Sequence, residues 1–137
     1  MNKGTLYLIE YDNYIEETNL LYQRTHSGKI RKLFQKYCLQ ELTTLEGRIT
    51  AVKQIFNYGY NVPVYINRDL LFIKVHGQQT MWINICTIQQ LLKTPKGTDL
   101  IFQGDVVLHL DANYRSMVNA YKKAQAILAY KNDFIYE

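Results

Sequence analysis

The sequence predicts an α+β fold, an antiparallel β-sheet meander with a central short helix and a C-terminal helix. Apolar residues alternate with a period of two over several short segments, which turn residues separate. A period of 3.6 appears in the middle of the chain and again near its end. The chain has 137 residues, of which 47% are hydrophobic. A chain of this size has enough apolar residues for one core, so we expect residues 1–137 to form a single domain.

The first part of the chain is predicted to contain two strands and one helical segment. We expect the strands at Thr5–Tyr11 and Thr18–His26, because the first alternates and Asp12 with its neighbour supplies turn chemistry before the second. Ile30 to Leu39 then carries apolar residues at i, i+3, i+4 and i+7, with basic residues on the opposite face. This segment is predicted to form one or two helical turns.

A longer helix is predicted to begin at Thr43. Thr43 and Glu46 form the S/T-x-x-E pattern of a capping box, an apolar stripe follows, and Gly59 is a plausible C-cap. Gly47 is unusual there, because glycine in a helix costs about 1 kcal/mol relative to alanine. We expect that another backbone or a ligand phosphate approaches Gly47, or that the helix packs tightly against a strand.

The second part of the chain is predicted to be mostly strands. A meander is expected at Val62–Asn67, Leu70–Val75 and Thr80–Cys86, and Pro63 confines the first of these to a sheet edge or a strand start. The remaining elements follow in chain order. They are a short helix opened by a capping box at Thr87–Gln90 and stopped by Pro95 and Gly97, a hairpin of Thr98–Gln103 and Val106–Leu110, and a final helix at Asn113–Lys131.

Several function classes lack support in the sequence. No apolar run approaches the roughly 20 residues that span a bilayer, and no signal peptide opens the chain, so we expect a cytoplasmic protein without membrane contact. Cys38 and Cys86 are too few for a disulfide framework and, with the histidines, match no metal-ligand spacing. His109 and Asp111 have no nucleophile nearby in sequence, and no cofactor motif occurs. We therefore expect no enzyme activity, no metal and no cofactor.

Basic residues concentrate in one part of the chain. The formal net charge is +4. Residues 18–60 hold seven basic and two acidic side chains, whereas residues 1–17 hold one basic and four acidic side chains. Clustered basic charge is compatible with binding to nucleic acid, although many proteins carry a solvated basic face.

An ordered set of short motifs resembles the ComK family of bacterial competence transcription factors. The order is a cysteine, a pair of small hydroxyl residues followed by Gly-Arg, a Pro-Val strand, a Leu-Phe strand and a Trp-Ile-Asn strand, and the resemblance covers roughly residues 30–90. The matching residues are Cys38, Thr43-Thr44-Leu45-Glu46-Gly47-Arg48, Val62-Pro63-Val64-Tyr65-Ile66, Leu70-Leu71-Phe72 and Trp82-Ile83-Asn84.

This resemblance implies a cytoplasmic transcriptional activator of DNA-uptake genes. It implies binding to A/T-rich double-stranded promoter boxes, mainly through the minor groove, by a dimer or a pair of dimers. RNA polymerase and an adaptor-protease system are further implied partners.

The candidate DNA-binding residues combine this resemblance with the distribution of charge. Arg48 lies in the Gly-Arg pair that matches the family and is the first candidate, because minor-groove readers use arginine in narrow A/T-rich grooves. An ion pair from Arg48 to Glu41 or Glu46 is the structural alternative. The full candidate set is Arg48, Lys53, Gly47, Thr44, Lys29, Arg31, Lys32 and Lys36, the last four as phosphate contacts.

Two other functions remain open at this stage. The first is a protein-interaction module of the same fold that does not bind DNA. The second is a single-strand binder, because the chain has 12 tyrosines that could stack on bases. Burial in the core or in a dimer interface is the structural explanation for most of these tyrosines, and Trp82 is expected to be a packing residue.

Overall fold

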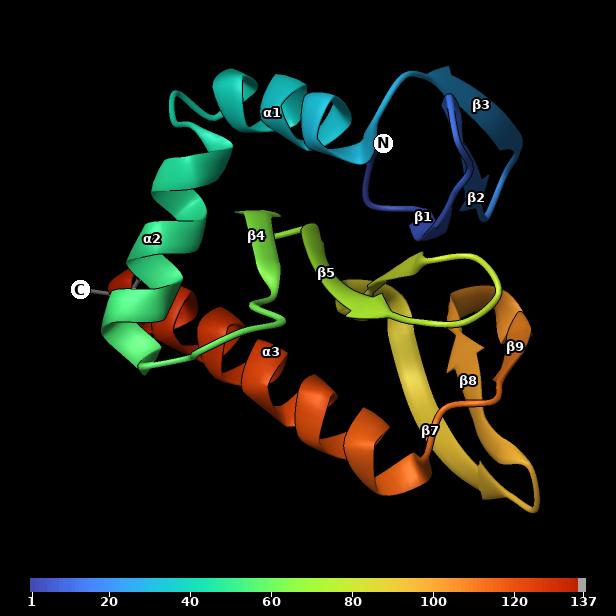
Figure 1. The fold of residues 1–137 in the computed structure, drawn as a ribbon. Helices are drawn as coiled ribbons and strands as arrows, with labels where there is room; N and C mark the ends of the chain where they lie inside the picture. Colours follow the sequence, from blue (N-terminus) through green and yellow to red (C-terminus); the bar gives the residue numbers. More distant parts are fainter. Residues whose placement is uncertain (136–137) are drawn as a thin grey trace.

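The structure is a computed structural model that describes residues 1–135, and it confirms the α+β class. One antiparallel sheet has the strand order β3-β2-β1-β6-β5-β4, and a second has the order β7-β8-β9 (Figure 1). The strands are β1 (Thr5–Glu10), β2 (Tyr14–Asn19), β3 (Gln23–Ser27), β4 (Val64–Asn67), β5 (Leu70–Val75), β6 (Met81–Asn84), β7 (Ile88–Thr94), β8 (Gly97–Phe102) and β9 (Val107–Leu110). The helices are α1 (Ile30–Gln40), α2 (Leu45–Phe56) and α3 (Tyr114–Ile135), with short 3-10 turns at Ile85–Thr87 and Gln103–Asp105.

The larger sheet is buried on both faces at its strand β5. In β5, Leu70 and Phe72 belong to one apolar cluster, whereas Leu71, Ile73 and Val75 belong to the other. Successive side chains of a strand point to opposite faces, so an almost continuous apolar run is what a doubly covered strand requires. The two clusters lie on opposite sides of β5.

Helices α1 and α2 cover the first face. The ring of Phe34 on α1 lies 5.2 Å from that of Phe72 and 5.1 Å from that of Trp82. The backbone N–H of Leu45 donates to Oε1 of Gln35 at 2.7 Å, which fixes the start of α2 against α1. Helix α2 lies beside β4, the last strand of the sheet (Figure 1).

Helix α3 and the smaller sheet cover the second face. Met117, Ala124 and Ile127 are the buried residues of α3 in this cluster, as the 3.6 period predicts. The far end of α3 reaches α2, where the rings of Phe56 and Tyr130 are 5.4 Å apart. Helices α2 and α3, which cover opposite faces of the larger sheet, therefore contact each other beyond its β4 edge.

Many predicted elements are confirmed. The segment Ile30–Leu39 is helical, the meander is β4-β5-β6, and the hairpin after it is β8-β9. Pro63 precedes β4, which is an edge strand of its sheet, as expected for a residue without an N–H. Trp82 is a packing residue, with its ring edge-on to Phe34.

The predicted strand Thr18–His26 is wrong, because the chain reverses within it. β2 ends at Asn19 and β3 starts at Gln23. The Asn19 side chain accepts a hydrogen bond from the backbone N–H of Leu21 at 3.1 Å, and its backbone N–H donates to the Tyr22 carbonyl at 2.9 Å. Asparagine forms such local turns readily, and this turn accounts for the difference.

The predicted helix opening at Thr87 is also wrong. Residues Ile88–Thr94 form β7, which pairs along its length with β8. The Thr87 hydroxyl does not cap a helix but donates to the Asn84 carbonyl at 2.8 Å. Only a few residues with a helical pattern follow Thr87, and a helix that short is unstable. Pairing with β8 provides the backbone hydrogen bonds of this segment instead.

The ends of α2 differ by a few residues from the prediction. Its N-cap is Thr44 and not Thr43, and its C-cap is Asn57, which has a left-handed conformation, and not Gly59. The backbone N–H of Gly47 donates to the Thr44 hydroxyl at 3.0 Å. A Cβ on Gly47 would lie 3.0 Å from that hydroxyl oxygen, so the cap itself and not a second backbone crowds this glycine.

Candidate nucleic-acid interface

The outer face of α1 carries a cluster of exposed basic side chains. Arg31, Lys32 and Lys36 are exposed, and the opposite face of the helix is buried through Leu33 and Phe34. Among the residues that the structure describes, no carboxylate lies within ion-pair distance of these three cations. This α1 cluster presents three charges to solvent that are available to an anionic partner.

Lys29 lies at the start of α1, next to this cluster. It is the N-cap residue of the helix, and its Nζ donates a hydrogen bond to the backbone carbonyl of Asp12. The side chain of Lys29 is exposed. Lys29 therefore joins the loop after β1 to α1 and adds a fourth positive charge at this end of the helix.

Arg48 is attached to the sheet and half-buried. Its Nη2 donates to the Ile66 carbonyl at 3.1 Å, and its guanidinium carbon lies 5.0 Å from the centre of the Tyr65 ring. Nε of Arg48 is buried and has no hydrogen-bond partner in the described part of the chain. The alternative ion pair with Glu41 or Glu46 does not form there, because the side chain turns to β4 instead.

The other candidates on α2 occupy different positions. Thr44 is the exposed N-cap, and Gly47 lies in the first turn with its N–H bound to Thr44. Lys53 is exposed in the last turn of the helix. Hence Thr44 and Gly47 shape the start of α2, and Lys53 lies at its other end.

The structure brings together some of the predicted residues and not others. Lys29, Arg31, Lys32 and Lys36 lie on α1 or at its start, because one helix carries them. Arg48 instead joins Lys131 of α3, whose ammonium lies 5.6 Å from the centre of the same Tyr65 ring. The predicted set is therefore divided between α1 and α2.

A second basic cluster lies at a position that the sequence did not indicate. Lys93 lies near the end of β7 and Lys96 in the β7-β8 turn, and together with Arg115 of α3 they line one cleft of about 630 Å³. Part of this segment was predicted to be a short helix and not one strand of a hairpin. The Pro95-Lys96-Gly97 sequence is a turn signal that could have indicated the hairpin.

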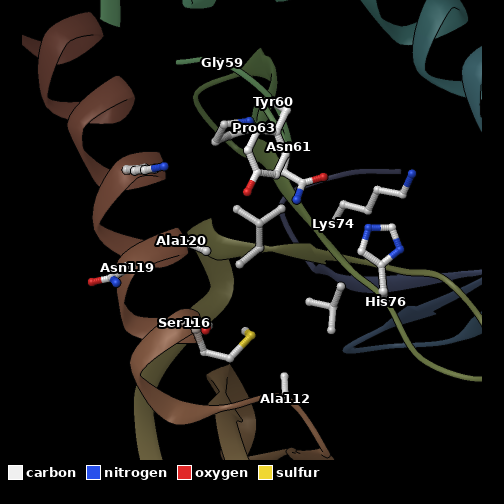
Figure 2. Close-up of a pocket in the computed structure, with 14 residues that line it drawn as sticks. Gly59, Tyr60, Asn61, Pro63, Lys74, His76, Ala112, Ser116, Asn119 and Ala120 are labelled. Atoms are coloured by element: carbon white, nitrogen blue, oxygen red, sulfur yellow. The ribbon is translucent and has the colours of Figure 1, made fainter. Parts of the chain in front are cut away.

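A separate cavity of about 550 Å³ lies between α3, β5 and the loop that follows α2 (Figure 2). Ile73, Val75 and Met117 supply apolar surface, and the polar side chains around it include Asn61 and Ser116. Lys74, His76 and Lys123 are its ionisable lining residues besides Tyr60. None of the predicted DNA-binding residues lines this cavity.

Two of the three histidines lie beside carboxylates, in different parts of the fold. His26 lies 2.8 Å from the buried Glu17, and His109 lies 2.7 Å from Asp99. Burial raises the pKa of Cys38, and it raises the pKa of Cys86 to about 11, so both thiols are protonated at neutral pH. Within residues 1–135 no group of three or more His, Cys, Asp or Glu side chains is arranged to hold a metal ion.

None of the helices in the described part of the chain is both long and apolar enough to cross a membrane.

Comparison with known protein families identifies a match for this chain. The family model described as ComK protein matches residues 10–133, nearly the whole chain. No curated protein matches, and no solved structure matches. The match includes α1, α2 and the β7-β8 hairpin, and it extends well beyond the motifs between residues 30 and 90. The chain therefore belongs to the ComK family.

Proposed function

We propose that this protein binds A/T-rich double-stranded promoter boxes, mainly through the minor groove, and thereby activates DNA-uptake genes. The ComK family is a family of competence transcription factors and not of enzymes, and this general role follows from membership. The observation that carries the proposal is the family match over residues 10–133. DNA as the ligand, and the groove that is read, form our proposal.

The α1 cluster supports DNA as the ligand. Arg31, Lys32 and Lys36 project from one helix without acidic partners in the described chain. Lysine and arginine side chains that replace counterions on phosphates supply much of the affinity of proteins for duplex DNA. We assign these three residues and Lys29 to phosphate contacts.

Arg48 has a different role in this proposal. One Nη2 N–H is bound to Ile66 and Nε is buried, so we assign the remaining Nη N–H groups to acceptors in a narrow groove. The Ile66 bond and the Tyr65 ring would hold the guanidinium in position. Thr44 and Gly47 at the start of α2, and Lys53 in its last turn, are the remaining residues that we assign to the DNA interface.

Other parts of the proposal concern assembly and partners. A dimer or a pair of dimers would present the α1 cluster repeatedly along one promoter, in keeping with closed symmetric assemblies. RNA polymerase and an adaptor-protease system are the protein partners that we propose. Such an activator would act in the cytoplasm, where bacterial promoters are located.

Duplex binding tests this function directly. We would titrate the chain onto labelled A/T-boxed, shuffled A/T and G/C-rich duplexes and onto single strands at several salt concentrations, and then add a minor-groove competitor. We expect selective binding to the A/T-boxed duplex, displaced by the competitor. Preference for single strands, or no binding to any duplex at low salt, contradicts the proposal.

Variants of α1 test whether the α1 cluster is part of the DNA-binding surface. Arg31→Gln, Lys32→Gln and Lys36→Gln combined should reduce the slope of log affinity against log salt by about 0.9 for each phosphate that is no longer neutralised. The matched control combines Lys3→Gln, Arg68→Gln and Lys74→Gln, which remove the same charge from exposed positions elsewhere. Equal effects of both triple variants would show only a dependence on net charge.

A protein-interaction module is the second candidate function. Leu42 is 96% exposed and Leu39 is 55% exposed, both where α1 meets α2. Exposed apolar side chains of this size are typical of protein contacts when they cluster. Retained partner binding by the chain, with no duplex binding in the same titration, would favour this second function.

A further inference from the structure

Tertiary contacts connect the start of β8 with the end of β9 and with the residues that lead into α3. Thr98 donates from its hydroxyl to the Ala112 carbonyl at 2.9 Å, and this threonine is fully buried. Gly97 lies so close to β9 that a Cβ there would be 2.1 Å from the Leu110 carbonyl oxygen. These contacts hold residues 93–97 beside residues 111–115, although the two segments are distant in sequence.

This arrangement gathers basic charge around one cleft. Lys93 and Lys96 come from the hairpin and Arg115 from α3, and all three side chains are exposed. Asp111 is the one acidic residue in the lining, and its Oδ1 lies 3.5 Å from Nε2 of His109. No ion pair joins any of the three cations to a carboxylate within residues 1–135.

The cluster lies far from α1. Figure 1 shows the hairpin extending at the lower right of the molecule, at the start of α3, whereas α1 lies at the top. The turn at the tip holds Pro95 and Lys96 between the paired residues Thr94 and Gly97, and both turn residues are exposed. A narrow, exposed turn of this kind can approach a nucleic-acid backbone closely, and its basic side chains then neutralise phosphates.

We propose that the β7-β8 tip and Arg115 form a second phosphate-binding surface for duplex DNA, separate from the α1 cluster. This inference rests on the proposed DNA-binding function and extends it to residues that the sequence motifs did not indicate. Lys93, Lys96 and Arg115 each contact a phosphate, and the pairing of the hairpin with β9 and α3 fixes their spacing. The surface adds affinity and extends the footprint without reading bases.

A triple variant tests this surface. We expect Lys93→Gln, Lys96→Gln and Arg115→Gln together to weaken duplex binding at least about tenfold at fixed salt and to lower the salt slope by roughly 0.9 for each phosphate concerned. Replacing Lys93 and Lys96 by arginine should retain the affinity, because the charge is kept. The Lys3, Arg68 and Lys74 triple variant is the charge-matched control, and thermal melting checks the fold of each protein.

The possible results separate this inference from the proposed function. Normal binding and an unchanged salt slope in the hairpin variant, with weaker binding in the α1 variant, overturn the inference and leave DNA binding intact. An equal effect in the charge-matched control also overturns it, because the effect would then be one of net charge. Absence of duplex binding by the unmodified chain overturns both proposals. A footprint shortened at one end in the hairpin variant supports the second surface independently.

Discussion

The carboxylate of Glu17 lies 2.8 Å from Nε2 of His26, and the Glu17 side chain is completely buried. Glu17 also accepts a hydrogen bond from the Thr5 hydroxyl at 2.6 Å, and its Oε1 lies 3.8 Å from the N-terminal amino group. A buried carboxylate requires such partners, because an unpaired charge in the interior is costly. The group joins β1, β2 and β3 at one end of the larger sheet.

This group makes stability depend on pH. Burial on its own raises the pKa of Glu17, but hydrogen bonds from Thr5 and His26 and the N-terminal charge together bring it below the ordinary value of 4.5. A lowered pKa in the folded state means that Glu17 contributes stability above about pH 4.5, and that this contribution disappears as the pH falls through the folded-state pKa. We expect Glu17→Gln to lower the unfolding free energy by about 1–3 kcal/mol at pH 7. Urea unfolding between pH 7 and 3 checks this, and the variant should show the flatter acid dependence.

Glu16→Gln is the control for this prediction. Glu16 is exposed on the same strand, so its replacement should change the unfolding free energy by less than about 0.5 kcal/mol. An identical acid dependence in the unmodified chain and the Glu17 variant would contradict a structural role for the carboxylate.

Arg48 is expected to contribute to stability as well as to DNA binding. Arg48→Ala removes the donor to the Ile66 carbonyl and the packing on Tyr65, so we expect the unfolding free energy to fall by about 1–3 kcal/mol. From the sequence alone, this replacement is expected to leave the fold intact, because Arg48 lies off the apolar stripe of α2. Arg31→Ala on the exposed face of α1 should be nearly neutral, and chemical unfolding of both variants compares them. Equal stabilities would show that the bond to Ile66 is energetically unimportant.

Asn84 is predicted to be one of the least replaceable polar residues. Its Nδ2 donates to the Thr5 carbonyl at 2.8 Å and to the Asp69 carbonyl at 2.9 Å, and its Oδ1 accepts from Leu71 N–H at 3.1 Å. Asn84→Asp would place an oxygen against two carbonyl oxygens in a fully buried position. We expect the unfolding free energy to fall by about 3 kcal/mol or more, measured by thermal or urea unfolding. The exposed Asn119→Asp is the comparison, and a similar small effect at both positions would refute the prediction.

Gly97 is expected to tolerate no side chain. Its φ is +149°, and a Cβ would lie 2.1 Å from the Leu110 carbonyl oxygen. Gly97→Ala should therefore separate the hairpin from β9 and cost at least about 3 kcal/mol, whereas a Cβ at Gly59 meets nothing within 4 Å. Thermal melting of the Gly97→Ala and Gly59→Ala variants makes the comparison. Equal melting temperatures would mean that the backbone at Gly97 adjusts without cost.

Local periodicity in the sequence was sufficient to predict several elements. The apolar spacing over Ile30–Leu39 predicted α1 with its basic outer face, and the final stripe predicted α3, because both patterns arise from neighbouring turns of one helix. Alternation predicted the β4-β5-β6 meander and the β8-β9 hairpin, since it reflects the two faces of a single strand. The concentration of basic charge on α1 could therefore be predicted without any long-range contact.

The meeting of distant segments, in contrast, depends on the folded chain as a whole. β1 pairs with β6, Arg48 bonds to Ile66, and the β7-β8 turn lies beside Arg115. None of these pairings has a local signal, because each depends on how two buried faces and their strand registers fit together in the core. The strand at Ile88–Thr94 is the clearest case. Its local sequence predicted a short helix, but hydrogen bonding to β8 makes it a strand. The second basic cluster exists because that pairing places the hairpin against the start of α3.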